Sequence, residues 1–314
     1  MHAQQPTTPA TDEAAGVVVP LASSAPPSAK PTGRLRSAGA AWGPAIPLIL
    51  LVLACLIGPA IVLVIQTVWG ADGFTLGNWT KVLGQAANQD AIVTSLELAV
   101  TSATITLIIG SPAAWLISRM LAGRRAFWLG LLNVAANFGG IGLAFAYLAT
   151  LGVVGMLTLA IQALGIGFVP PRSSSFIALL FAYEYTNIPL FVLLTIPAMG
   201  ILRDDWWEAA QTAAATRWQF WRRVGLPVLT PFLVGGWILI FTWSIGIYGI
   251  AYGLAGQSGG TAVHLITLQI GNSLQSDVLF GPARAGVLAV VLMAIATASL
   301  LTYRVLLRRA LRWF

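Results

Sequence analysis

The sequence predicts an all-α integral membrane protein with six transmembrane helices. Hydrophobic residues make up 57% of the 314-residue chain, whereas Asp, Glu, Lys and Arg together make up only 9%. A soluble globular protein carries roughly a quarter charged residues, so this chain lacks the polar surface to face water on all sides. The mean hydropathy of +0.83 leads to the same conclusion. Together these values exclude a soluble enzyme.

The apolar residues are gathered into runs of the length that crosses a membrane. A hydrocarbon core about 30 Å thick requires about 20 consecutive apolar residues in a helix. The sequence contains six such runs, at 43–69, 92–118, 127–151, 176–201, 228–253 and 283–304. We therefore expect a single six-helix transmembrane domain over residues 43–314.

Residues 1–42 differ in composition and are expected to form a disordered cytoplasmic tail. Six prolines lie between Pro6 and Pro31, among many Ala, Ser and Thr residues, and no continuous hydrophobic face is present. Such a segment cannot bury enough apolar surface to offset the entropy of ordering. A charged segment at the start is missing, and the first apolar run is long enough to stay in the membrane. The tail is therefore not interpreted as a signal peptide.

The basic residues predict the orientation of the chain in the membrane. Of the 17 Lys and Arg residues, fourteen fall on one side of the predicted spans, and only Lys81, Arg172 and Arg284 fall on the other. The side richer in Lys and Arg faces the cytoplasm. Both termini and the connection 203–226 are therefore expected in the cytoplasm, with the spans in a bacterial plasma (inner) membrane.

The sequence offers no set of residues for catalysis or for binding a cofactor. Cys55 is the only cysteine, and the two histidines, His2 and His264, are far apart, so no metal site built on Cys or His is expected. No nucleophile with a neighbouring base and no phosphate-binding glycine loop is present. The basic clusters lie between apolar runs, which is typical of membrane topology and argues against nucleic acid as a partner.

The connection 203–226 carries the most specific pattern in the chain. Asp204 and Asp205 are suited to cap or open a helix, because carboxylates interact favourably with the free amides at a helix N-terminus. An alanine-rich stretch continues this helix, and Thr216 is placed to cap a second short one. Pro227 suits the first turn of the fifth span. We expect two small helices lying against the membrane.

This connection resembles the EAA loop of ABC importer permeases. The positions that carry the resemblance are Glu208, Ala209, Ala210, Ala214, Phe220, Leu226 and Pro227. In that family the loop is a coupling helix that sits in a groove of the ATP-hydrolysing subunit, so these residues are expected to contact such a subunit. The family usually has Gly where this chain has Ala214, and Gly would permit the bend between the two helices at low cost. Here either Thr216 makes the turn or the helices are less sharply angled. The alternative for the whole connection is an ordinary interfacial amphipathic helix.

The resemblance covers nearly all of residues 43–314 and implies the six-helix fold of a type I ABC importer permease. The segment 74–79 resembles the usual first external segment of the family. The segments 137–146 and 185–190 are similar to the third and fourth spans of the spermidine/putrescine branch, although iron, sulfate, thiamine and phosphonate importers share much of this architecture. The resemblance implies four kinds of partner: a dimer of ATP-binding subunits, a second permease subunit of a different chain, an extracytoplasmic substrate-binding protein and the lipid bilayer. ATP hydrolysis is expected on a partner, so this chain is not expected to be an enzyme.

Polar residues inside the spans are candidates for a substrate pathway, because they are costly in a membrane without a role. Glu184 and Asn187 stand three residues apart and so share one face of the fourth span. Pro189 beside them frees a backbone carbonyl in the preceding turn. A hydrogen-bonded contact between helices is the alternative role for this pair. Glu97 lies near the outer end of the second span, where water or a cation can reach it.

The third and fifth spans add further polar positions. Asn137 lies beside glycines in the third span, and Ser244, Tyr248 and Tyr252 recur every four residues in the fifth, so they are expected on one helix face. A carboxylate and two aromatic rings suit a cation, so the predicted substrate is a small organic cation such as a polyamine. Iron, phosphonate, thiamine, sulfate or sugar stay open as substrates. A proton-coupled secondary transporter also stays open, although the two halves show no internal repeat.

Overall fold

A computed structural model describes residues 45–70, 73–256, 263–275 and 281–310. The predicted disordered tail, 1–42, lies outside these residues. The chain divides into two units, 1–55 and 56–314. The structure describes only the start of one helix in the first unit, and the contacts reported below all lie within the second.

Almost all the described residues are helical, as predicted. The longer helices are α2 (Ala45–Val68), α4 (Ala86–Ser118), α5 (Ala122–Asn137), α6 (Gly140–Leu151), α8 (Phe176–Met199), α11 (Leu226–Ile245) and α14 (Gly281–Ala310). The shorter ones are α3 (Gly77–Leu83), α7 (Met156–Ala163), α9 (Asp204–Thr212), α10 (Arg217–Phe220), α12 (Gly249–Ala255) and α13 (Ile266–Gln275). Two-residue strands β1 (Trp69–Gly70) and β2 (Gly73–Phe74) form an antiparallel pair after α2.

Within the described residues, six helical segments are long and apolar enough to cross a membrane, which confirms the predicted number. They are Ile46–Val68, Ala86–Ser118, Gly140–Ala163, Phe176–Met199, Arg217–Ile245 and Gly281–Leu306. Four of them overlap the predicted runs closely. The third and fifth differ from the prediction, and both differences have a structural cause.

The prediction of one continuous third helix over 127–151 is wrong. α5 ends at Asn137, and α6 begins at Gly140, whose φ of +69° is a conformation that residues with a side chain rarely adopt. The start of α12 approaches closely at this point. A Cβ added to Gly249 would lie 2.9 Å from the Cα of Gly140. The small residues of this region therefore permit a break in one helix and the close approach of another.

The fifth predicted span, 228–253, is also interrupted. α11 ends at Ile245, and three residues separate it from α12. A helix that ends leaves backbone carbonyls without intrahelical partners, and these need other donors when they are buried. The carbonyl of Ile247 accepts hydrogen bonds from the hydroxyls of Tyr183 and Thr267, each at 3.2 Å. Side chains of α8 and α13 thus stabilise the interruption.

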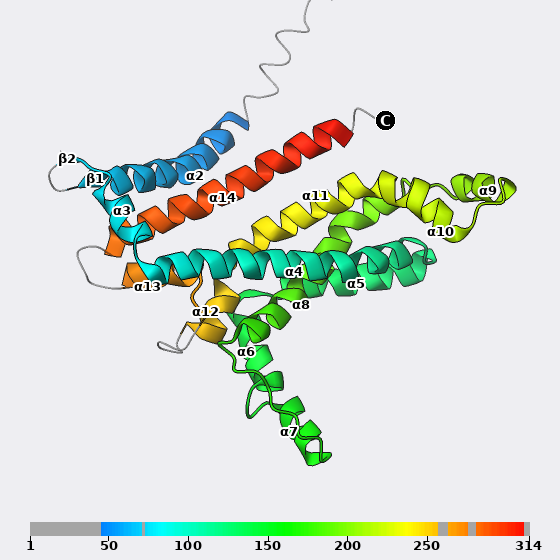
Figure 1. The fold of residues 1–314 in the computed structure, drawn as a ribbon, viewed down its shortest axis with the longest axis horizontal. Helices are drawn as coiled ribbons and strands as arrows, with labels where there is room; N and C mark the ends of the chain where they lie inside the picture. Colours follow the sequence, from blue (N-terminus) through cyan, green and yellow to red (C-terminus); the bar gives the residue numbers. More distant parts are fainter. Residues whose placement is uncertain (1–44, 71–72, 257–262, 276–280, 311–314) are drawn as a thin grey trace, which may run out of the picture. The chain divides into compact units, whose positions relative to one another are not determined.

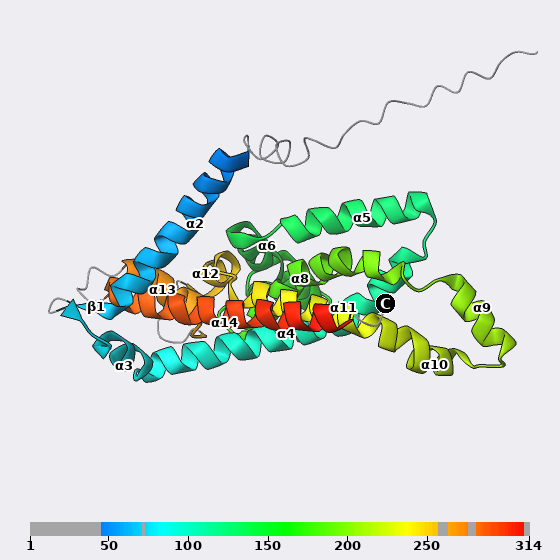
Figure 2. The same cartoon turned by 90° about the horizontal axis from the view of Figure 1, so that it is seen from above.

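The core of the second unit lies where α4 packs along α8 and α11 (Figures 1 and 2). The side chain of Phe191 on α8 is fully buried at the centre of this contact. A Cβ added to Gly110 of α4 would lie 2.6 Å from one side of its ring, and a Cβ added to Gly236 of α11 would lie 2.8 Å from another ring atom. The two glycines thus let three helices approach closely, which is typical of helix packing in membranes.

The arginine-rich connections meet at one end of the second unit. Both views show α9 and α10 at the same end as the turn between α4 and α5 (Figures 1 and 2). Arg119 closes α4, and Arg203 and Arg217 precede α9 and open α10 respectively. This is the end that the sequence predicts to face the cytoplasm.

Candidate functional site

The loop predicted to couple the chain to an ATPase begins with α9. Asp204 and Asp205 occupy its first turn, as expected for acidic residues at a helix N-terminus. The residue that precedes the helix is Arg203, which has an extended backbone and makes no side-chain capping bond. Its guanidinium pairs with the carboxylate of Asp205 at 2.5 Å. The start of α9 is therefore strongly charged and exposed.

The bend between the two small helices is made by Ala214. Its φ of +54° lies in the left-handed region, where Gly is the usual residue. The amide of Ala214 donates to the carbonyl of Gln211, and the amide of Ala215 donates to that of Ala210, each at 2.9 Å. These two bonds are those of a Schellman motif, which satisfies the last carbonyls of a helix. The expectation that Thr216 makes the turn is therefore wrong, because Ala214 itself adopts the conformation that Gly would favour.

The second helix begins as the sequence predicts. The hydroxyl of Thr216 accepts from the amide of Gln219 at 3.3 Å, and the side chain of Gln219 accepts from the amide of Thr216 at 2.8 Å. This reciprocal capping box opens α10. A π-helical turn over Trp221–Gly225 then leads into α11, with Leu226 and Pro227 in its first turn. The two helices thus continue directly into the fifth membrane-capable segment.

The predicted coupling residues fall into an exposed group and a buried one. Glu208, Ala209 and Ala214 are exposed, as are Leu226 and Pro227 at the start of α11. Within the described part of the chain, the carboxylate of Glu208 has no hydrogen-bond or ion-pair partner, so it is free to meet another protein. Ala210 is half-buried.

Phe220, by contrast, is buried and holds the loop together from inside. Its ring packs edge-on against Trp207 of α9, with centroids 5.3 Å apart, and against Trp221, with centroids 6.2 Å apart. Trp221 in turn packs edge-on against Trp115 of α4 at 5.5 Å. Edge-to-face pairs of this kind contribute about 0.5–1.5 kcal/mol each beyond the burial of their surface. An unbroken series of aromatic rings therefore connects α4 to α9.

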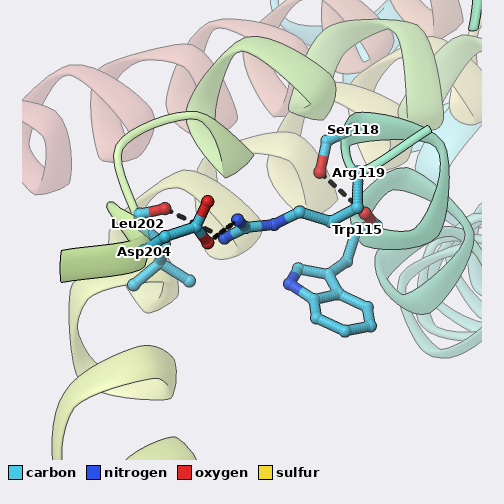
Figure 3. Close-up of polar contacts among 5 residues, drawn as sticks. All are labelled: Trp115, Ser118, Arg119, Leu202 and Asp204. Carbon is cyan, nitrogen blue, oxygen red and sulfur yellow. Dashed lines mark hydrogen bonds and ion pairs between the residues drawn. The ribbon is translucent and has the colours of Figure 1, made fainter. Parts of the chain in front are cut away.

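Arg119, at the end of α4, makes a second connection to the loop (Figure 3). One guanidinium nitrogen forms an ion pair with the carboxylate of Asp204, and the other donates to the carbonyl of Leu202 at 3.0 Å. A cavity of about 320 Å³ lies beside this contact and is lined by Trp115, Arg119, Leu202, Arg203, Asp204, Trp207, Arg217, Phe220 and Trp221. In the sequence Arg119 is one of the basic residues that predict topology, and nothing there pairs it with Asp204. The available signal is that this arginine and this acid both border predicted cytoplasmic connections.

Glu184 and Asn187 of α8 lie at a buried polar contact between three helices. The hydroxyl of Thr106 on α4 donates to Oε2 of Glu184 at 2.7 Å. The amide nitrogen of Asn187 donates to the hydroxyls of Ser102 on α4 and Ser244 on α11, each at 2.8 Å. Asn187 is fully buried and Glu184 is 8% exposed. The pair does share one helix face, as predicted, and that face points into the chain's own helix packing.

Two acceptor atoms in this polar contact have no hydrogen-bond partner among the described residues. They are Oε1 of Glu184 and Oδ1 of Asn187, both buried. Buried polar atoms without partners are uncommon and costly, and in a membrane segment they draw attention to a role beyond packing. Two oxygen atoms of this contact are thus available to accept further hydrogen bonds.

The remaining predicted pathway residues do not join this contact as a group. Asn137 is exposed at the end of α5, where its amide bonds to Asn133 at 2.8 Å. Ser244 lies in the last turn of α11, and Tyr248 lies in the interruption, directly before α12, so the prediction that they share one continuous helix face with Tyr252 is wrong. The rings of Tyr248 and Tyr252 are stacked with centroids 5.4 Å apart. A cavity of about 320 Å³ next to Tyr248 is lined also by Thr267, Ile270, Gly271, Leu274 and Gln275.

Comparison with known proteins relates this arrangement to transport permeases. No protein-family model matches the chain. It is 28% identical over 178 residues to the molybdenum transport system permease protein ModB of Mycobacterium tuberculosis, a match that covers 55% of this chain and 64% of that protein. It is 42% identical over 76 residues to the sulfate transport system permease protein CysT of Escherichia coli, covering 24% and 27%. With the spermidine/putrescine transport system permease protein PotB of Escherichia coli, identity is 24% over 220 residues, covering 70% and 79%.

The chain thus spans less than two thirds of the length of the ModB relative. Its backbone is similar to a chain of the bacterial alginate ABC transporter crystallised with an alginate pentasaccharide-bound periplasmic protein. That match has a TM-score of 0.67 at 16% identity and covers 88% of this chain and 96% of the other. The chain is therefore a multi-pass inner-membrane protein with the fold of ABC transporter permeases, and its relatives are transport system permease proteins.

Proposed function

We propose that this chain is the permease subunit of an ABC importer and that residues 203–226 couple it to an ATP-binding subunit. The observation that carries the proposal is the exposed, capped two-helix loop, which presents the unpaired carboxylate of Glu208 and leads directly into α11. An ordinary interfacial helix would not need an internal turn held by a Schellman motif and a capping box. The fold and the relatives support the same function.

The proposed assembly contains three kinds of protein partner besides lipid. Two ATP-binding subunits lie beneath the loops, and a second permease subunit, of a different chain, completes the passage. An extracytoplasmic binding protein delivers the substrate, as the solved alginate transporter in complex with its periplasmic protein illustrates for that system. The sequence contains no phosphate-binding glycine loop, so the partner subunits supply ATP hydrolysis and this chain performs no chemistry.

In the proposed mechanism the chain converts the movement of the ATP-binding subunits into opening of a passage. ATP binding closes those subunits and draws the coupling loops together, and hydrolysis reverses the movement. The loop can follow such a movement as one body, because Phe220 packs against both Trp207 and Trp221. The charged group that meets the partner is Glu208.

For the substrate we propose a small organic cation such as a polyamine. The stacked rings of Tyr248 and Tyr252 and the adjoining cavity offer the aromatic faces that attract cations. The match to PotB, the spermidine/putrescine relative, also covers a larger share of both chains than the match to ModB. A second candidate is the kind of substrate named for the CysT and ModB relatives, sulfate or molybdenum. The high identity to CysT over 76 residues favours it.

A charge reversal at Glu208 tests the coupling proposal. Losing one partner of a desolvated charge pair costs about 2–5 kcal/mol, so Glu208→Lys is expected to abolish uptake and ATPase co-purification while leaving membrane insertion normal. The matched control is Asp90→Lys, which reverses the charge of an exposed acid near the start of α4, at the end of that helix that lies away from the loop. This control is expected to leave co-purification unchanged. Uptake by Glu208→Lys at the wild-type rate would show that the loop does not couple the chain to an ATPase.

The energy source separates this function from a proton-coupled secondary transporter. An importer in proteoliposomes requires ATP on the side of the loop and continues to transport when a protonophore collapses the proton gradient. A carrier that uses Glu97 and Glu184 would show the reverse dependence. Competition among polyamines, sulfate and molybdate for uptake then distinguishes the two substrate candidates.

A further inference from the structure

The end of α4 is joined to the coupling loop by two kinds of contact. Arg119 binds both the carboxylate of Asp204 and the carbonyl of Leu202, that is, the first turn of α9 and the residue two before it (Figure 3). Trp115, one turn earlier on α4, packs against Trp221 at the far end of the loop. The two ends of the loop are thus tied to neighbouring positions on one helix.

The same helix also carries the hydroxyls that reach the buried polar contact. α4 is a helix of 33 residues, and Ser102 and Thr106 lie three to four turns before its end. Thr106 donates to Glu184, and Ser102 accepts from Asn187, which also donates to Ser244 of α11. A movement of the loop that displaces the end of α4 therefore acts directly on a contact shared by α4, α8 and α11.

We propose that Arg119 is a positioning residue that passes movement of α9 to α4, and through α4 to the Glu184–Asn187 contact. This inference rests on the proposed coupling function and adds a residue that the loop sequence does not contain. Because Arg119 and Trp115 hold both ends of the loop against α4, a displacement of the loop also moves α4. A loop attached only through α8 and α11 would bend without moving α4.

The test is a charge-swap series with uptake and ATP hydrolysis measured together. Arg119→Asp is expected to lower the amount of substrate carried per ATP hydrolysed several-fold, because the ATPase still binds at Glu208 while α4 no longer follows. The double variant Arg119→Asp/Asp204→Arg restores the ion pair, although not the bond to Leu202, and is expected to recover part of that ratio. A coupling term between the two substitutions identifies a direct interaction.

The matched control uses an arginine at the same end of the second unit that lies outside the loop. Arg124, in the first turn of α5, is exposed, and its side chain has no hydrogen bond or ion pair among the described residues. Arg124→Asp is expected to leave the transport ratio unchanged. An equal loss in Arg124→Asp would show that loss of any positive charge at this surface is harmful and would overturn the proposal.

A second measurement tests whether Arg119 holds the loop in the purified chain, without any partner. Chymotrypsin cuts at aromatic residues, which none of these substitutions alters, and cleavage in the loop depends on its local opening. An exposed ion pair is worth no more than about 1 kcal/mol, so Arg119→Asp is expected to speed cleavage about 2–5-fold, and the double variant to slow it again. Unchanged cleavage shows that Arg119 does not hold the loop. If the wild-type chain fails to associate with an ATPase, the proposed function is wrong. The cleavage rates still show whether Arg119 holds the loop.

Discussion

The contact of Phe191 with two glycines gives a prediction about the packing of α4, α8 and α11. Gly110→Ala places a methyl group 2.6 Å from Cδ1 of Phe191, far inside the contact distance of two carbon atoms. The ring has little room to move away, because the side chain is fully buried and the backbone of α11 lies close to its other edge, where a Cβ added to Gly236 would lie 2.8 Å from Cε2. Overpacking of a buried site costs about 1–3 kcal/mol, and we expect a loss in this range.

The assay is the melting temperature of the purified chain in detergent. Gly110→Ala is expected to melt several degrees below the wild type, and adding Phe191→Leu is expected to recover part of the loss by shortening the side chain that obstructs the methyl group. Gly130→Ala is the control, since no atom lies within 4 Å of a Cβ at this position of α5. Alanine is favoured over glycine in a helix by about 0.5–1 kcal/mol, so the control melts at or above the wild-type temperature. A wild-type melting temperature for Gly110→Ala would refute the packing argument.

Three further predictions concern the loop, the buried acid and the topology. Ala214→Val places a β-branched residue at a φ of +54° and is expected to lower ATPase coupling, whereas Ala214→Gly keeps it, measured as ATPase stimulation by the permease. Glu184→Gln is expected to reduce uptake of a cationic substrate severely with assembly intact, and unchanged uptake with the same binding protein would overturn the proposed role of its charge. Reporter fusions at residues 20 and 314 are expected to report the cytoplasm and those at residues 80 and 262 the outside, so a reversal at any of them would contradict the positive-inside assignment.

The sequence predicts the number of membrane-capable helices and the two-helix form of the loop 203–226, because both depend on local composition. Apolar runs mark spans, and Thr216 with Gln219 marks a helix start within four residues. The interruptions inside the third and fifth runs are harder to predict. Apolar residues continue through both, so hydropathy cannot separate one long helix from two shorter ones. The contacts that accompany the breaks come from elsewhere in the chain: α12 packs closely against Gly140, and Tyr183 and Thr267 bind the carbonyl of Ile247.

Contacts between distant residues are beyond the reach of a single sequence. Thr106 and Glu184 are 78 residues apart, and Arg119 and Asp204 are 85 apart. The sequence identifies Glu184 as a costly charge but not the hydroxyl that binds it, and it identifies Arg119 as a cation but not its acid. The left-handed Ala214 was missed for a different reason. The hydrogen bonds of the Schellman motif stabilise the left-handed conformation at this position. Ala adopts it at a moderate cost in energy, so the usual preference for Gly does not predict it.

The two helix interruptions have a consequence for the kind of solute that this fold can carry. The end of α5 with the start of α6, and the end of α11 with the start of α12, meet where Gly249 faces Gly140. Peptide groups at such ends are dipoles with no net charge, and they present either an N–H or a C=O. The carbonyl of Ile247 is already bonded to Tyr183 and Thr267, so only the remaining groups could contact a solute. Under the proposed function such uncharged groups would distinguish little between cations and anions, and selection would rest with the protein that delivers the solute. Relatives named for molybdenum, sulfate and spermidine/putrescine transport fit that division of roles.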